Sequence, residues 1–549
     1  MTSFENRITA SPVPFDALRG REVLATLDPS FAKGPVAELI SGSAGSSPYL
    51  ARLLTRHAGS LSELLSQDPD ATLHALCSDL VSEAAAAPSH SALGALMRQA
   101  KSRAALLIAL SDLGGVWELA NVTEALTKLA DTCVETAAKW LMVRAVEAGN
   151  LPGLTSEQAS AGTGLIILAM GKMGAYELNY SSDIDLIVLF DDSRFHEDDL
   201  TEVRSRFVKL TRDLVKLLSE NTAQGYVFRT DLRLRPSPST TPVCMAISAA
   251  ERYYETVGRT WERAAHIKAR PLVDEAAGDA YLQGLVPFIW RRNLDYAAIE
   301  DTQEMLRKIR AQKAQFTVDA MPGHDLKLGP GGIREIEFFA QTRQLIMGGR
   351  DPALRVRDTV GALSVLAGAG WIGQDVEASL VSSYQVLRGI EHRLQMIDDA
   401  QTHAVPRSPE ARARLAALCG YPDATRFEAT LADRLARVHA TCEAFFSSGS
   451  GKAQVSQRNP DEQALEAAGF ERPGDAVRTL SRWREAGIAA TRSDRARALF
   501  AQLEPHIVSR LGQATQPDQA LGHFDRFLTG LPAGVQVFSL FSANPQLLD

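Results

Sequence analysis

Two acidic residues, Asp183 and Asp185, stand two positions apart at the start of an unbroken apolar run over residues 186–190. Such a run is typical of a buried strand, and alternate residues of a strand leave the same face. Two carboxylates held side by side repel each other and are costly to desolvate unless a cation lies between them. Oxygen ligands in this arrangement suit Mg²⁺ or Mn²⁺. Taken alone, the pair favours a simpler interpretation, solvated carboxylates at a strand end.

A third acidic residue, Asp231, lies in the segment YVFRTDLRLRP, residues 226–236, in which polar and apolar residues alternate. The alternation predicts a strand with Asp231 on its polar face, beside the first acidic strand. Three carboxylates on adjacent strands can hold two cations that clamp a phosphoryl group during in-line displacement. Arg229, Arg233 and Arg235 share the predicted polar face and could bind phosphate oxygens. The alternative is a salt-bridge ladder, although three arginines exceed what one aspartate needs.

Further residues could contact a nucleotide or a phosphate group. GKMG, residues 171–174, lacks the Walker pattern, but its glycines permit a tight turn whose amides approach a phosphate. The serine before the acidic pair could contact phosphate or cap a turn. HIKARP, residues 266–271, predicts a strand whose cations lie near a nucleotide or extend along a sheet edge. The full set of candidates is Gly171, Lys172, Ser182, Arg229, Arg233, Arg235, Lys268 and Arg270.

The surrounding sequence predicts the elements that hold these residues. GLIILAMG and DIDLIVLFD, residues 164–171 and 183–191, are typical of two buried strands, and apolar residues at helical spacing predict a helix over 200–217. A long amphipathic helix is predicted over 380–397. The expected fold class is α+β and predominantly α-helical, with a small mixed sheet flanked by helical domains.

The length of 549 residues is too great for one compact core. We expect a helical N-terminal region at 1–150, a sheet-bearing catalytic domain at 151–345 and a helical bundle at 346–450. The last expected segment, 451–549, begins in a polar linker, SSGSGKAQVSQRNPDEQ (447–463), and continues into the start of a further helical regulatory domain.

Composition excludes several classes of protein. The formal net charge of −8 gives no general attraction to nucleic acid or to an anionic membrane. The five cysteines are scattered and form no CxxC pair, which argues against a disulfide framework and a thiolate zinc site. No signal peptide or membrane span is recognisable, so a cytoplasmic protein without nucleic-acid or membrane partners is expected.

A glycine-rich turn, then SDID on a strand, then an acid on a later strand resembles the nucleotidyltransferase superfamily that includes DNA polymerase β. Longer strings are similar to bifunctional glutamine synthetase adenylyltransferase/adenylyl-removing enzymes, particularly those of alphaproteobacteria. They include GKMGAYELNYSSDIDLIVLFD, FRTDLRLRP, YYETVGRTWERAAHIKARP, KLGPGGIREIEFFAQTRQLIMGGR and DAQTHAVP. The resemblance is strong over residues 165–406 and implies a polymerase β-like catalytic domain.

Enzymes of that family carry two nucleotidyltransferase domains, one attaching AMP to a tyrosine of glutamine synthetase and the other removing it. GAYELNYSSDID resembles the N-terminal, adenylyl-removing domain, and the abrupt end at Asp549 agrees with an N-terminal fragment. The resemblance implies phosphorolysis, in which orthophosphate attacks the AMP phosphorus and releases ADP. It implies Mg²⁺ or Mn²⁺ at Asp183, Asp185 and Asp231, with glutamine synthetase, a PII signalling protein, ADP or ATP, and orthophosphate as partners.

One departure from the family is SPSTTPV after RLRP, where many members have a Gly-Asp-Ser-Gly type of sequence. Two other functions compete with AMP removal. One is the reverse direction, AMP transfer from ATP to the same protein. The other is a helical regulatory scaffold without catalysis, against which the intact acidic triad argues.

Overall fold

The computed structural model describes residues 4–291, 321–448 and 462–541, apart from positions 486, 493, 532, 533, 535, 536 and 539. These residues form two compact units. One unit ends at residue 444 and the other begins at residue 445. The boundaries expected at residues 150 and 345 both fall within the first unit and stay predictions. Most of the linker expected at 447–463 lies outside the described residues.

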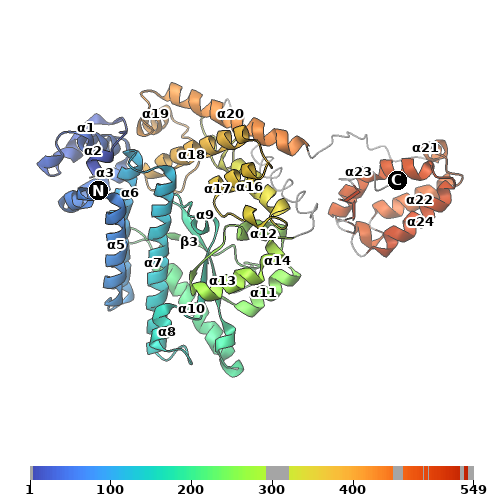
Figure 1. Cartoon of the computed structure of the whole chain (residues 1–549), viewed down its shortest axis with the longest axis horizontal. Coiled ribbons are helices and arrows are strands. Elements are labelled where there is room, and N and C mark those ends of the chain that lie inside the picture. Colours follow the sequence, from blue (N-terminus) through green and yellow to red (C-terminus); the bar gives the residue numbers. More distant parts are fainter. Residues whose placement is uncertain are drawn as a thin grey trace. The chain divides into compact units, whose positions relative to one another are not determined.

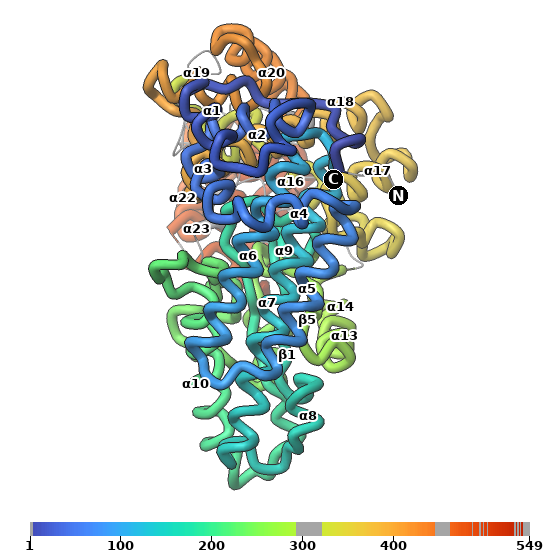
Figure 2. Tube along the Cα trace, turned by 90° about the vertical axis from the view of Figure 1, so that its left-hand side faces the viewer, coloured from blue at the N-terminus to red at the C-terminus, as the bar shows by residue number. Residues whose placement is uncertain are grey.

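The first unit begins with helices, as the sequence predicts. They are α1 (Ala17–Ala25), α2 (Pro35–Ser46), α3 (Pro48–Arg56), α4 (Leu61–Ser66), α5 (Pro69–Ala85), α6 (His90–Leu113), α7 (Leu119–Glu147) and α8 (Ser156–Ala161). The long helices α5, α6 and α7 lie side by side (Figures 1 and 2). Helix α6 begins at a side-chain cap, in which the Ser89 hydroxyl accepts a hydrogen bond from the amide of Ala92.

A small mixed sheet follows these helices. Its strands are β1 (Leu165–Ala169), β2 (Asp183–Phe190), β3 (Arg229–Asp231), β4 (Met245–Ala246) and β5 (Arg270–Val273). Strand β1 is antiparallel to both β2 and β5, and β2 is parallel to β3 along one half and to β4 along the other. The helices between the strands are α9 (Gly171–Gly174), α10 (Leu200–Ser219), α11 (Ile247–Thr256) and α12 (Thr260–His266), with α13 (Glu275–Gly284) and α14 (Val286–Ile289) after β5.

Strand β2 is buried on both faces, which explains its apolar sequence. Ile187 and Leu189 pack into a core with residues of α11–α14, and Phe190 stacks on Phe207 of α10 with ring centroids 5.1 Å apart. Only Asp183 and Asp185 are partly exposed, because the strand emerges from the core at this end. The predicted strands at 164–171 and 183–191 and the helix at 200–217 are confirmed.

Two strand predictions are wrong in extent. The alternating segment 226–236 is a strand only over Arg229–Asp231, because the Asp231 carboxylate accepts the amide of Arg233 at 2.7 Å and turns the chain. The arginines of this segment therefore do not share one face. In 266–271, His266 still belongs to α12 and the strand begins at Arg270.

A second set of helices completes the first unit: α16 (Ile333–Met347), α17 (Thr359–Gly368), α18 (Gln374–Met396), α19 (Pro409–Leu418) and α20 (Ala424–Ser448). The long helix predicted over 380–397 is confirmed as α18. Its buried face carries ionic side chains as well as leucines, a feature that helical periodicity does not reveal. The α+β, mostly helical fold class is confirmed.

A buried ionic network joins α18 to the sheet domain. The guanidinium of Arg388, which is 0% exposed, donates to the Glu177 carbonyl at 2.5 Å and to Asn179 Oδ1 at 2.6 Å and 3.0 Å. Glu177 in turn accepts from Lys268 Nζ at 2.5 Å and from the Tyr384 hydroxyl at 2.9 Å. Because every charge here has a partner, the network fixes α18 against the loop that leads into β2.

The network continues toward the start of α9. Lys172 Nζ donates to Glu391 Oε2 at 3.3 Å, and His403 Nδ1 lies 2.7 Å from Glu391 Oε1. Although burial raises the pKa of Glu391, Lys172, His403 and Arg388 hold it well below its usual range. Burial lowers the pKa of Lys172 to about 7, against the opposing charge of Glu391.

The second unit contains α21 (Glu462–Ala467), α22 (Pro473–Arg484), α23 (Asp494–Gly512) and α24 (Pro517–Gly530). Its core includes Trp483, whose ring meets Phe500 edge-on at 5.6 Å and whose indole nitrogen donates to Asp525 at 2.7 Å. Among the described residues, no helix combines the length and apolarity needed to cross a bilayer.

Replacement of Arg388 tests the network. Arg388→Met leaves the Glu177 carbonyl and Asn179 Oδ1 without this donor and removes the ion pair with Glu391. The expected loss of about 3–5 kcal/mol should lower the melting temperature of the first unit by about 3–6 °C. Arg437→Met on α20 is the control, because Arg437 is 57% exposed and pairs only along its own helix. Scanning calorimetry measures both, and equal melting shifts would contradict a structural role for the network.

Candidate active site

The three acidic residues meet where β2 and β3 run in parallel. The register pairs Asp185 with Asp231 and Asp183 with Arg229, so the third acid lies beside the first two, as the sequence predicts. The amide of Met170 donates to the Asp185 carbonyl at 2.9 Å and ties the end of β1 to the same place. Backbone pairing, rather than any loop, therefore places the acids.

Asp185 is the most strongly perturbed carboxyl of the group. Burial, followed by the neighbouring charges of Asp183 and Asp231, raises its pKa to about 7, while Lys327 and Arg233 oppose the shift. This pattern is that of acids crowded at one point without enough positive charge nearby. In such an electrostatic environment, binding of a divalent cation would be especially favourable.

Asp231 is already engaged by a cation of the chain. The Arg233 guanidinium donates to both carboxylate oxygens of Asp231, with Nε 2.7 Å from Oδ2, while its own side chain stays 81% exposed. Burial raises the pKa of Asp231, but the hydrogen bonds and charge of Arg233 lower it below its usual range. With the side chains placed so, no three His, Cys, Asp or Glu residues in the described part of the chain are grouped to hold a metal.

Gly171 lies directly against the Asp185 carboxylate. Its φ is +53°, and a Cβ built on it would lie 2.7 Å from Asp185 Oδ2. A residue with a side chain would therefore be strained at this position and would collide with the carboxylate. The glycine expected to approach a phosphate thus lies against the acidic cluster.

The other two candidate arginines hold backbone. Arg229 donates to the Ser181 carbonyl at 3.1 Å and to the Asp399 carbonyl at 3.1 Å. Arg235 donates to four carbonyls, among them Pro238 at 2.7 Å and Pro242 at 3.0 Å. Arg235 therefore fixes the SPSTTPV loop in its folded form, and Arg233 is the candidate arginine bound to an acid of the cluster.

The remaining candidates divide between the cluster and the network behind it. Ser182 directly precedes Asp183 and is partly exposed. Lys172 belongs to the buried network, and Lys268 lies 2.5 Å from Glu177 in the same network. Arg270 donates to both oxygens of Asp131 on α7 at 2.8 Å. The structure therefore does not bring Lys268 and Arg270 to the acidic cluster of β2 and β3.

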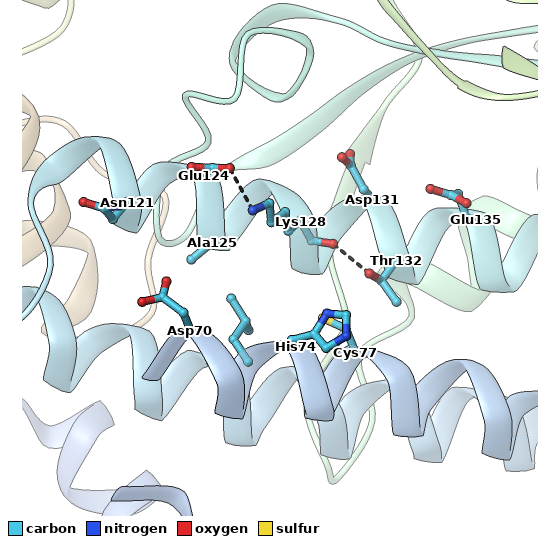
Figure 3. A pocket seen from close by; sticks show the side chains of 11 residues that line it. Asp70, His74, Cys77, Asn121, Glu124, Ala125, Lys128, Asp131, Thr132 and Glu135 are labelled. Carbon is cyan, nitrogen blue, oxygen red and sulfur yellow. Dashed lines mark hydrogen bonds and ion pairs between the residues drawn. The ribbon is translucent and has the colours of Figure 1, made fainter. Parts of the chain in front are cut away.

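Asp131 lines a separate hollow of about 380 Å³ between α5 and α7 (Figure 3). Four of the eleven residues that line it carry carboxylates, and Lys128 there is paired with Glu124 at 2.8 Å. Burial raises the pKa of Asp131 to about 6 despite its bond to Arg270. The three acids of the sheet do not line this hollow, so it is distinct from the candidate active site.

Sequence reasoning missed several residues around the acids. Gln401 Nε2 donates to Asp183 Oδ1 at 2.9 Å, and Asp399 accepts from the Ser181 hydroxyl at 2.8 Å. Lys327 is close enough to oppose the shift of the Asp185 pKa. These residues lie about 140–220 positions away along the chain. The available signal was that two of the strings that carry the resemblance, KLGPGGIREIEFFAQTRQLIMGGR and DAQTHAVP, begin at Lys327 and Asp399.

Comparisons with known proteins agree with this arrangement. The family model for glutamate-ammonia ligase adenylyltransferase matches residues 37–283, which contain the whole sheet and the three acids. A relative from a Bradyrhizobium species, a bifunctional glutamine synthetase adenylyltransferase/adenylyl-removing enzyme, is 42% identical over 96% of this chain and 56% of its own length. The chain belongs to the glutamine synthetase adenylyltransferase family. A relative of the same description from Mesorhizobium japonicum is 40% identical over 100% of the chain and 58% of its own length. Another, from Xanthobacter autotrophicus, is 43% identical over 95% of the chain and 54% of its own length.

The adenylyltransferase-family chain thus spans little more than half the length of the curated relatives it matches. A second family model, for GlnD PII-uridylyltransferase, matches residues 301–446, which include α16–α19 and most of α20. The acids therefore belong to one match, and Gln401 and Asp399 belong to the other. The nucleotidyltransferase assignment of the fold is confirmed.

Replacement of Gly171 tests its contact with Asp185. If the acids bind a cation, Gly171→Ala should weaken binding of Mn²⁺ by at least about 10-fold, because the new methyl group would displace the Asp185 carboxylate. Gly225→Ala is a matched control, since Gly225 has φ +90° but nothing within 4 Å of its built Cβ. Backbone strain is then common to both variants. Equal Mn²⁺ affinities by isothermal titration would show that the contact has no role in cation binding.

The raised pKa of Asp185 predicts a pH-dependent stability. An unfolded aspartate titrates near pH 3.9, so the folded, metal-free chain holds the extra proton between about pH 4 and pH 7 and loses stability as pH rises through that window. Asp185→Asn removes this loss. In chelator, it should raise the melting temperature by about 3–6 °C at pH 8 and hardly at all at pH 4. Asp198→Asn, at a 90% exposed carboxylate, should show no such difference between the two pH values.

Proposed function

We propose that this chain removes AMP from an adenylylated tyrosine of glutamine synthetase by phosphorolysis. The observation that carries the proposal is the register pairing of Asp185 with Asp231, with Asp183 on the same strand, in a sheet of the adenylyltransferase family. Orthophosphate attacks the phosphorus of AMP, and the bond from phosphorus to the tyrosine oxygen breaks. The products are ADP and unmodified tyrosine, whose oxygen takes the proton given up by the phosphate.

Asp183, Asp185 and Asp231 fit a divalent cation, Mg²⁺ or Mn²⁺, in donor type and in position. All three supply carboxylate oxygens, and burial together with their crowding at the end of β2 raises the Asp185 pKa. Bound there, such a cation would neutralise phosphoryl charge and favour departure of the tyrosine oxygen, whose pKa in the free phenol is about 10. For Asp231 to serve as a ligand, its carboxylate must turn from Arg233.

Arg233 is the candidate arginine for the incoming phosphate. It is 81% exposed and donates to Asp231, so its guanidinium is free to move once that carboxylate turns to a cation. A planar guanidinium matches two phosphate oxygens. Arg229 and Arg235 act differently: Arg229 binds the carbonyls of Ser181 and Asp399, and Arg235 binds carbonyls of the chain that follows β3. No strong general base is required, because the reaction is mainly one of charge stabilisation.

Transfer of AMP from ATP to the same tyrosine is the second candidate. It is favoured by the relatives, which are named as bifunctional adenylyltransferase/adenylyl-removing enzymes. The match of residues 301–446 to a PII-uridylyltransferase model supports a further proposal, that a PII-type protein is a regulatory partner. A cytoplasmic location follows from these proposed substrates.

A direct assay distinguishes these activities. The chain is incubated with adenylylated glutamine synthetase, Mg²⁺ and labelled orthophosphate, and the release of labelled ADP is measured. Asp183→Asn and Asp231→Asn should each reduce the rate by about 100-fold or more, whereas Asp198→Asn should not. Incorporation of AMP from ATP without ADP release would overturn removal in favour of transfer. Retention of full activity by both aspartate variants would overturn the site.

A further inference from the structure

The turn that follows α18 reaches the acids of β2. Gln401, five residues after the end of α18, donates its Nε2 to Asp183 Oδ1 at 2.9 Å. The glutamine side chain is itself exposed, so packing does not hold it. Its position is set by the backbone of the turn. The contacts that hold the turn therefore determine whether the Gln401 amide reaches the Asp183 carboxylate.

Asp399 organises this turn. Its φ of +54° is in the left-handed region, which costs a non-glycine residue about 1 kcal/mol or more. Its carboxylate accepts from the Ser181 hydroxyl at 2.8 Å and the Tyr226 hydroxyl at 3.1 Å, and it lies 3.7 Å from Lys101 Nζ. Its carbonyl accepts from Arg229 at 3.1 Å. The turn is thereby bound to the residue two before Asp183 and to the first residue of β3.

The donors at the two ends of the cluster differ in charge. Asp231 is held by the guanidinium of Arg233, which neutralises it. Asp183 is held by an amide, which fixes one oxygen and leaves the negative charge and the second oxygen in place. Neutral donors that orient a ligating carboxylate without competing for its charge are the usual outer partners of metal ligands.

We propose that Gln401 is a positioning residue for Asp183 and that Asp399 sets the turn that delivers it. The inference rests on the proposed function, because Asp183 matters as a ligand only if the acids bind a cation. It assigns the 301–446 segment a direct part in a site whose acids all lie in the 37–283 segment. Movement of α18 or its turn would then alter cation binding from a distance.

Binding of Mn²⁺ to the full chain, followed by electron paramagnetic resonance, tests the proposal without any protein substrate. Gln401→Met keeps the side-chain length but removes the donor, and it should weaken Mn²⁺ binding about 10-fold. Asp399→Asn tolerates the left-handed backbone but loses the charge that holds the turn, and a loss of about the same size is expected. Gln374→Met, an exposed glutamine at the other end of α18, is the matched control.

Two further measurements separate positioning from general stability. The melting temperature of Gln401→Met should match that of the control, because an exposed side chain adds little to the fold. The double variant Gln401→Met/Asp399→Asn should bind Mn²⁺ about as tightly as whichever single variant has the lower Mn²⁺ affinity, since both changes act through Asp183. Additive losses would overturn the link between the turn and the amide.

The outcomes distinguish this inference from the proposed function. Normal Mn²⁺ binding by the unaltered chain and by Gln401→Met overturns the inference and leaves the proposed function intact. Absence of Mn²⁺ binding in the unaltered chain overturns the metal site and the inference with it. Weakened Mn²⁺ binding in Gln401→Met supports the inference even if the chain releases no ADP from adenylylated glutamine synthetase.

Discussion

Arg388 carries five donors and no acceptor, lies fully buried, and must find its partners inside the protein. It finds them in the loop before β2, where it binds the Glu177 carbonyl and Asn179. Burying so many ionic groups is favourable only when all of them are paired, so α18 has essentially one position against the sheet domain. The rest of the site depends on this constraint, because the turn after α18 contacts Asp183.

The acids are held in place, whereas one of the three arginines near them can move. Backbone pairing fixes Asp185 beside Asp231, and burial together with mutual repulsion raises the pKa of Asp185 to about 7. Arg229 and Arg235 are committed to carbonyl groups, whereas Arg233 is exposed and bound to a side chain. A rigid anionic cluster beside one movable cation is suited to chemistry on a phosphoryl group, in which charge must be held in place and a second anion admitted.

Several features of the fold were predictable from residues alone. The apolar runs gave β1 and β2, helical spacing gave α10 and α18, and the three acids were expected on neighbouring strands. The alternation around Asp231 predicted too long a strand. The Asp231 carboxylate accepts the amide of Arg233, which ends the strand, and an alternating sequence does not reveal that hydrogen bond. Lys268 was expected near a nucleotide on charge alone, although its partner Glu177 lies 91 residues away in the sequence.

The sequence by itself determined the class of fold, the acidic triad and the family, since these depend on local periodicity and on strings of residues that stay together in the chain. Only the tertiary structure decided which cations meet the acids and which are used to hold the protein together. That division depends on pairings between distant segments, such as Gln401 with Asp183 and Arg388 with Glu177. The physical reason is that a buried charge takes whichever partner the packed elements bring within hydrogen-bond distance, and sequence spacing does not encode that distance.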